Sequence, residues 1–171
     1  MLSELVDKFN RHRNPIKYWR KKGCSIGSEC EIYPTANFGS EPYLIKIGNH
    51  VRINSGVQLV THDGGVWVLR YLVDNLKDID MMGTISIGEN VHIGTNAMIM
   101  PGITIGNNVI IGTGSVVTRN IPDNSVAVGI PARVIETIEE YKAKHEKDFL
   151  HTKFLDKETK KKTLINHFKI G

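Results

Sequence analysis

The sequence predicts a fold of stacked six-residue units, and three observations support this prediction. An aliphatic residue occupies every sixth position through the middle of the chain, at Ile87, Ile93, Ile99, Ile105, Ile111 and Val117. Four positions after each of these six residues comes a second small or aliphatic residue. Glycine directly follows the aliphatic residue in four of the six units. A helix would drift out of register with this spacing, because 3.6 residues per turn does not divide six. Each unit can therefore bury its apolar side only by stacking on the next one.

Length and composition favour a single domain of 171 residues. Two cysteines, Cys24 and Cys30, lie six positions apart, and we expect free buried thiols rather than a disulfide, as suits a reducing cytoplasm. No apolar run reaches the length of a membrane span, and the N-terminus lacks the apolar core of a signal peptide. The expected location is therefore cytoplasmic.

The first 22 residues are predicted to form a separate helical segment. Apolar residues have helical spacing at Leu2, Leu5, Val6 and Phe9, and Pro15 should end or kink this first helix. A basic stretch then runs to Lys22, and Lys160, Lys161 and Lys162 form another near the end of the chain. The simpler interpretation of both is a solvated surface, and the alternative is attraction to a phosphorylated ligand or an anionic membrane surface. Nucleic acid is not an expected partner, because no binding motif accompanies the charge.

The six-residue period is also present earlier, with interruptions. It appears at Ile26, Ile32 and Phe38 and again at Ile47, Ile53 and Leu59. Between these runs, residues 41–43 shift the register and indicate a small loop or distorted corner. The register is lost at about residues 63–84, which we interpret as a loop extruded from the stack. Long loops within compact domains are usually functional.

Beyond Pro131 the repeat stops. Val134, Ile135, Ile138 and Tyr141 have helical spacing, and a charged tail follows to Gly171. The expected organisation is therefore a helical segment at 1–22, a repeat domain at 23–131 carrying the loop, and a C-terminal helix with its tail at 132–171.

The repeats resemble the hexapeptide-repeat acyltransferases, above all in residues 111–122 (IGTGSVVTRNIP) and 128–132 (VGIPA). The closest likeness is to the sugar O-acetyltransferases, such as the galactoside and maltose enzymes and those of bacterial polysaccharides. The resemblance covers about residues 23–138 and implies an all-β fold, a left-handed parallel β-helix of triangular section with about three units per coil. General topology would favour right-handed crossovers, so the handedness comes from the resemblance alone. The resemblance also implies a homotrimer with active sites between subunits.

His62 is the predicted general base. The resemblance implies this role for a histidine where the regular coil gives way to the loop, and an imidazole titrates near neutrality. A sugar hydroxyl that loses its proton to His62 would attack acetyl-CoA directly, with no metal. Asp63 is the first candidate to orient the ring, although neighbours on an extended chain point to opposite faces. Asp78 and Asp80 are alternatives, and a simple turn-capping role for His62 is the competing interpretation.

The resemblance assigns five residues to the CoA groove. They are Thr95, Thr113, Thr118, Arg119 and Arg133, of which the arginines would meet phosphates. Glu136 occupies a position that is basic in some relatives, which weakens this phosphate site. Thr95 and Thr113 have the alternative interpretation of ordinary corner residues.

The acceptor side is expected to include five further residues. They are Asn37, Glu41, Tyr43, Trp67 and Asp80. Their polar groups would hydrogen-bond sugar hydroxyls, and the ring of Trp67 or Tyr71 would stack on a sugar ring. Each has the alternative interpretation of a structural loop residue.

The predicted activity is transfer of an acetyl group from acetyl-CoA to a hydroxyl of a sugar or glycan precursor. Alternatives within the class are N-acetylation of an amino sugar and O-acetylation of an antibiotic. Two other classes rank lower. A carbonic anhydrase-like zinc site would need three converging histidines, and the repeats offer His50, His62 and His92. A non-catalytic scaffold would leave His62 without a purpose.

Overall fold

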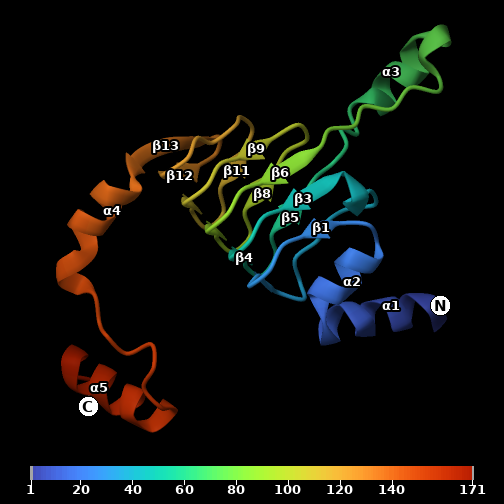
Figure 1. Ribbon diagram of the computed structural model, residues 1–171. Coiled ribbons are helices and arrows are strands. Elements are labelled where there is room, and N and C mark those ends of the chain that lie inside the picture. Colours follow the sequence, from blue (N-terminus) through green and yellow to red (C-terminus); the bar gives the residue numbers. More distant parts are fainter. Residues whose placement is uncertain (1, 171) are drawn as a thin grey trace.

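The computed structural model describes residues 2–170 and has a parallel β-helix at its centre (Figure 1). Sheet A comprises β1 (Ser25–Ile26), β3 (Ile45–Ile47), β6 (Ile85–Ile87) and β9 (Thr104–Ile105). Sheet B comprises β2 (Glu31–Ile32), β4 (Val51–Ile53), β7 (Val91–Ile93), β10 (Val109–Ile111), β12 (Ser125–Gly129) and β13 (Ala132–Thr137). Sheet C comprises β5 (Gln58–Leu59), β8 (Met98–Ile99) and β11 (Val116–Val117). The chain visits sheets A, B and C in turn, so three six-residue units complete each coil.

The repeated aliphatic residues fill the interior of the coils, as predicted. Ile47, Ile87 and Ile105 pair in register across sheet A, so each stacks on the equivalent residue of the next coil. Ile93 and Ile111 do the same across sheet B and have no exposed surface. Complete burial of one such side chain stabilises the fold by roughly 1.5–3 kcal/mol. The six-residue period therefore marks the side chains that stack on one another inside the coils.

The corners between sheets A and B carry a ladder of polar side chains. Asn90, Asn108 and Asn124 adopt positive φ angles of 54°, 54° and 57°. Each amide nitrogen donates to the oxygen of the next asparagine at 2.9 Å. His50 begins the ladder, with Nδ1 2.9 Å from Asn90 Oδ1. Asparagine suits this site because it tolerates the left-handed conformation and bonds its neighbours.

Two insertions interrupt the coils, both where the period breaks. The first contains a short 3₁₀ helix, η1 (Pro42–Leu44), which confirms the expected distorted corner. The second, residues 62–84, is called the arm and contains α3 (Val66–Leu72) and the 3₁₀ turn η2 (Asp74–Leu76). Figure 1 shows α3 projecting away from the stack, which confirms the extruded loop but adds a helix to it.

The N-terminal segment forms two helices, α1 (Leu2–Arg13) and α2 (Pro15–Lys21). Pro15 begins α2 and Asn14 caps it, with Asn14 Oδ1 accepting from the Lys17 amide at 2.9 Å. The predicted break at Pro15 is therefore confirmed. Trp19 of α2 is buried and stacks on Phe38 with ring centroids 4.6 Å apart. This stack closes the first coil.

The C-terminal segment differs from the expectation. Residues 132–137 form strand β13, antiparallel to β12, rather than the start of a helix. The apolar spacing suited a helix, but the open edge of sheet B offers these residues backbone partners, which overrides local spacing. The helix α4 (Ile138–His145) begins only after Thr137, whose hydroxyl forms a capping box with Glu140. The 3₁₀ turn η3 (Glu146–Asp148) and α5 (Lys157–Phe168) follow, and α5 lies apart from the β-helix in Figure 1.

Both cysteines are free thiols, as expected, although their environments differ. Cys24 is buried, and burial raises the pKa of its thiol to about 12. Cys30 is only half-buried, against the expectation that both would be buried. The helices of residues 2–170 are all too short or too polar to cross a membrane.

Candidate active site

His62 stands in the stem of the arm, where the chain leaves the end of sheet C. Strand β5 ends at Leu59, and His62 pairs with Met82 of the returning chain in an isolated antiparallel bridge. Backbone hydrogen bonds of 2.8 Å close the stem on both sides of this bridge. The His62 side chain is 46% exposed. The backbone is thus fixed while the imidazole stays accessible.

The carboxylate beside His62 belongs to Glu41. Glu41 Oε2 lies 3.4 Å from His62 Nδ1 and accepts a hydrogen bond from Thr61 Oγ1 at 3.1 Å. The Glu41 side chain is only 17% exposed, and Thr61 is fully buried. The carboxylate, which lies one coil before His62, is therefore held by the buried hydroxyl of Thr61 and lies against the ring.

Glu41 is ionised at neutral pH. A hydrogen bond from the Ser40 hydroxyl lowers the pKa of this carboxyl, and bonds from Thr61 and His62 lower it further against the opposing effect of burial. An anion beside Nδ1 favours the tautomer with the proton on that nitrogen. The lone pair of Nε2 is then directed away from Glu41, where an acceptor hydroxyl can meet it.

Asp63, the predicted orienting residue, is bonded to the chain of the arm and not to the His62 ring. Its Oδ1 accepts from the Gly65 amide at 2.8 Å and so shapes the turn that starts the arm. Asp80 forms an ion pair with Arg70 across the arm. Among the described residues, none of Asp63, Asp78 and Asp80 is bonded to His62. Glu41, which the sequence had suggested for the acceptor side, is the carboxylate that lies against the His62 ring.

Coil register explains this pairing. Ile26, Ile32 and Asn37 pair with residues 21 positions further on, at Ile47, Ile53 and Gln58. A regular coil repeats every 18 positions, as between Asn90 and Asn108, and the last coil is shorter at 16 positions. The insertion at residues 41–43 supplies the difference of three. At an offset of 21, Glu41 falls directly beneath His62, and this signal was available in the sequence.

A pocket of about 390 Å³ opens beside His62. Its wall is formed by the arm, with Trp67, Arg70, Asp80, Met81 and Met82 among the lining residues. Trp67 is 72% exposed on α3, so its ring face is available. The pocket brings together His62 and two of the predicted acceptor residues, Trp67 and Asp80.

The other predicted acceptor residues lie on the first coil. Asn37 Nδ2 donates to Gln58 Oε1 at 3.1 Å on the outer face of sheet C. Tyr43 belongs to η1, is 64% exposed, and packs its Cβ over Gly23. Neither residue lines the pocket beside His62.

The predicted CoA residues occupy both edges of sheet C. Thr118 and Arg119 follow β11 and share the corner of His62, because Val60, Met100 and Thr118 stack in one column. At about 4.8 Å per coil, Thr118 lies about 10 Å from Val60 along the axis. Both Thr118 and Arg119 are exposed.

Thr95 and Thr113 lie at the opposite edge of sheet C. They follow β7 and β10, and the Gly114 amide donates to the Thr95 oxygen at 2.8 Å, which stacks the two corners. Arg133 is exposed on β13 at the end of sheet B, while Glu136 pairs with Lys144 at 3.4 Å. One chain therefore does not bring the five residues into a single groove.

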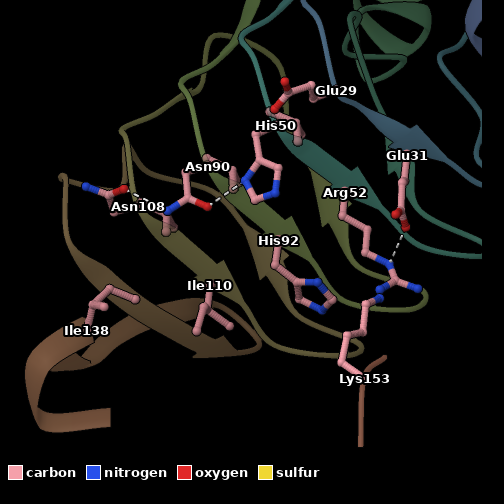
Figure 2. Close-up of a pocket in the computed structure, with 13 residues that line it drawn as sticks. Glu29, Glu31, His50, Arg52, Asn90, His92, Asn108, Ile110, Ile138 and Lys153 are labelled. Carbon is pink, nitrogen blue, oxygen red and sulfur yellow. Dashed lines mark hydrogen bonds and ion pairs between the residues drawn. The ribbon is translucent and has the colours of Figure 1, made fainter. Parts of the chain in front are cut away.

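The other two repeat histidines share a different pocket, on the outer face of sheet B (Figure 2). His50 bonds Asn90, as above, and His92 Nε2 lies 3.4 Å from Asn54 Nδ2. Burial, with a smaller contribution from Arg52, lowers the pKa of His92. His62 lies at another corner, and residues 2–170 contain no group of three side chains placed to hold a metal ion. The geometry thus gives no support to a zinc site.

Comparison with known proteins places the repeat in a described family. Residues 84–119 match the model for the bacterial transferase hexapeptide (six repeats). The chain is 50% identical over 152 residues to protein CapG of Staphylococcus aureus, covering 88% of this chain and 87% of that protein. It is 54% identical over 100 residues to the galactoside O-acetyltransferase of Escherichia coli (strain K12), covering 57% of this chain and 46% of that protein. The chain thus spans most of one relative and under half of the other.

Solved structures share the fold. A maltose O-acetyltransferase from Clostridium difficile 630 superposes with a TM-score of 0.52 at 31% identity, covering 71% of this chain and 73% of that one. A hexapeptide-repeat acetyltransferase from Vibrio cholerae, solved with acetyl coenzyme A, gives 0.57 at 28% identity, covering 68% and 61%. These likenesses confirm the left-handed parallel β-helix.

Proposed function

Because this chain belongs to the hexapeptide-repeat acyltransferases, we propose that it transfers the acetyl group of acetyl-CoA to a hydroxyl of a sugar or glycan precursor. The observation that carries the proposal is the Glu41–His62 pair, an oriented and exposed imidazole at the mouth of a pocket. Relatives named galactoside and maltose O-acetyltransferase support a sugar acceptor. The free thiols Cys24 and Cys30 support a cytoplasmic location.

The chemistry needs one base and no covalent intermediate. His62 Nε2 removes the proton of the acceptor hydroxyl, and the oxygen attacks the thioester carbonyl carbon. The tetrahedral intermediate collapses, the C–S bond breaks, and the sulfur of CoA leaves with the proton that His62 returns. Glu41 stabilises the imidazolium that forms between these two steps, because its negative charge is 3.4 Å from Nδ1. The products are an acetyl ester and CoA.

The proposed active unit is a homotrimer. Thr95 and Thr113 lie on one edge of sheet C, and His62 with Thr118 on the other, so one cofactor cannot follow both edges of a single chain. A second chain that places its Thr95 edge against the His62 corner would complete one groove. The exposed apolar arm supports this contact, because Trp67, Tyr71 and Leu72 are 72%, 87% and 68% exposed. Closed threefold symmetry supplies three such grooves.

The test is release of CoA from acetyl-CoA against a panel of sugars, amino sugars and antibiotics. We expect turnover with a sugar hydroxyl and at least about a hundredfold lower kcat for His62→Ala, since general-base catalysis contributes that much. Glu41→Gln keeps the side-chain shape but removes the charge, and should lower kcat by about tenfold.

Asp63→Asn is the matched control, because Asp63 lies next to His62 in sequence but caps the turn at Gly65. It should retain kcat within a few fold. If Asp63→Asn reduced kcat more than Glu41→Gln, the assignment of the orienting carboxylate would be wrong. A His62→Ala variant with wild-type kcat would overturn the proposed function, and turnover with amines alone would redirect it to N-acetylation.

A further inference from the structure

The positive charge of this chain is concentrated in its first 22 residues. This segment holds seven of the 22 lysines and arginines but only two of the 18 acidic residues, so it carries a formal +5 against +4 for the whole chain. Residues 23–131 hold five lysines and arginines against nine acidic residues, a formal −4, and residues 132–171 hold ten against seven, a formal +3. Positive charge therefore gathers at both ends of the chain and most densely in the first 22 residues, where it favours an anionic partner.

Helices α1 and α2 enclose an open cavity of about 610 Å³ with cationic walls. Arg13, Lys17, Lys21 and Lys22 line it, together with Asp7. Lys22 Nζ pairs with Asp7 at 2.8 Å, which neutralises one cation. Among the side chains that the structure describes (residues 6–7 and 9–170), no ion pair involves Arg13, Lys17 or Lys21, and all three are exposed. Three cations are thus available for external anions.

Two exposed apolar side chains lie on the same helix as Arg13. Val6 and Phe9 are 51% and 63% exposed on α1. Spacings of three and seven residues place Val6, Phe9 and Arg13 on one face of the helix. The exposure of Val6 and Phe9 shows that the rest of the described chain leaves both side chains open to solvent.

Exposed apolar side chains next to unpaired cations fit one kind of surface. The boundary of an anionic bilayer accepts apolar groups among its acyl chains and attracts lysine and arginine to its headgroups. A small phosphorylated ligand would use the cations but leave Val6 and Phe9 in water. The location also fits, because α1 and α2 lie at the opposite end of the stack from β13, and α3 projects away from them (Figure 1).

We propose that the α1–α2 cap is a docking site for an anionic phospholipid surface. Val6 and Phe9 enter the headgroup layer, and Arg13, Lys17 and Lys21 bind lipid phosphates. The contact is peripheral and reversible, because three cations and two apolar side chains amount to a weak anchor. It holds the enzyme near the membrane and leaves the pocket beside His62 accessible.

Co-sedimentation with vesicles tests this proposal. The full chain should bind phosphatidylglycerol-containing vesicles, show little binding to phosphatidylcholine vesicles, and bind less as salt increases. Each cation near the surface strengthens partitioning by about fivefold, so K17E/K21E should weaken it by at least about thirtyfold. Phe9→Ser should weaken binding to the anionic vesicles at both low and high salt concentration.

The matched control is K160E/K161E, which reverses two exposed lysines of α5. This variant should bind vesicles nearly as the wild type does, and CoA release with a soluble acceptor should be unchanged in both double variants. Equal loss from the α5 variant, or wild-type binding by K17E/K21E, would overturn the proposal. An absence of vesicle binding would also overturn the proposal. It would do so even if the cap bound inorganic pyrophosphate, or if Phe9→Ser changed the oligomeric mass of the protein.

Discussion

At the scale of single residues, His92 links the folded structure to pH. Its ring lies half-buried on the outer face of sheet B, and burial, followed by the charge of Arg52, lowers its pKa. The neutral ring is favoured in the folded state, since His92 Nε2 can accept from Asn54 Nδ2 at 3.4 Å. Protonation therefore works against folding.

The sign of this effect predicts a loss of stability in acid. The unfolded chain binds a proton at His92 more readily than the folded chain does. The contribution of His92 to the stability of the fold is therefore present above about pH 6.5 and is lost as the pH falls below this value. His92→Asn should show a smaller fall in Tm between pH 7.5 and 5 than the wild type. His151→Asn, at an exposed position of the tail, is the control. Parallel Tm curves for wild type and His92→Asn would contradict this account.

The candidate site shows what sequence can and cannot predict for a residue. His62 was predicted as the general base from the family resemblance, because it stands where the period breaks. Glu41 was placed on the acceptor side, because its contact with His62 follows only when the offset of 21 positions between Ile26 and Ile47 is extended to residue 41. Asp63 was misleading because adjacency in sequence suggests contact, whereas its side chain bonds the Gly65 amide.

At the scale of elements, the stacking of one corner on the next limits the size of the side chain that fits at a corner. A Cβ added to Gly88 would lie 2.7 Å from the Gly106 oxygen and 2.8 Å from its carbonyl carbon, which belong to the backbone of the next coil. The side-chain oxygen of Asn107 is also 2.6 Å away, and its rotation would not remove the two backbone contacts. Glycine is required here by the close approach of two backbones.

Gly88→Ala should therefore destabilise the fold, by about 3 kcal/mol, the upper end of the range for overpacking. Gly64→Ala is the matched control, because a Cβ there meets no atom within 4 Å and should change stability by less than about 0.5 kcal/mol. The midpoint of urea unfolding measures both. Equal midpoints for the two variants would show that the coils can separate without cost.

Strands were predictable from the period, and the segment after Pro131 was not. Stacking imposes a spacing of six on the core, so the pattern from Ile87 to Val117 identified the strands directly. Val134 and Ile135 were misassigned to a helix, because their strand exists only where β12 offers a free edge. Helix α3 was also missed, since its apolar residues face outward and give no pattern of burial.

At the scale of the whole molecule, the arm should determine assembly. The proposed trimer predicts a particle with three times the 19.2 kDa mass of the chain, measured by light scattering after size exclusion. A variant with Trp67, Tyr71 and Leu72 all changed to serine should shift toward the monomer and lose CoA release, because each groove needs two chains. The control is Phe154→Ser, which removes an aromatic ring that is 98% exposed in the tail. A trimer that survived loss of the arm's apolar residues would show that the sheets alone hold it.

The antiparallel strand β13 has a consequence for crowded solutions. Every parallel coil presents a free edge that is a template for the next, and an uncovered edge recruits strands from other molecules, as in fibril growth. Here β13 runs against β12 and occupies that edge of sheet B, while Trp19 over Phe38 seals the other end. An antiparallel strand at this position ends the parallel ladder of sheet B, so this edge offers no parallel template for a second copy to extend the column end to end.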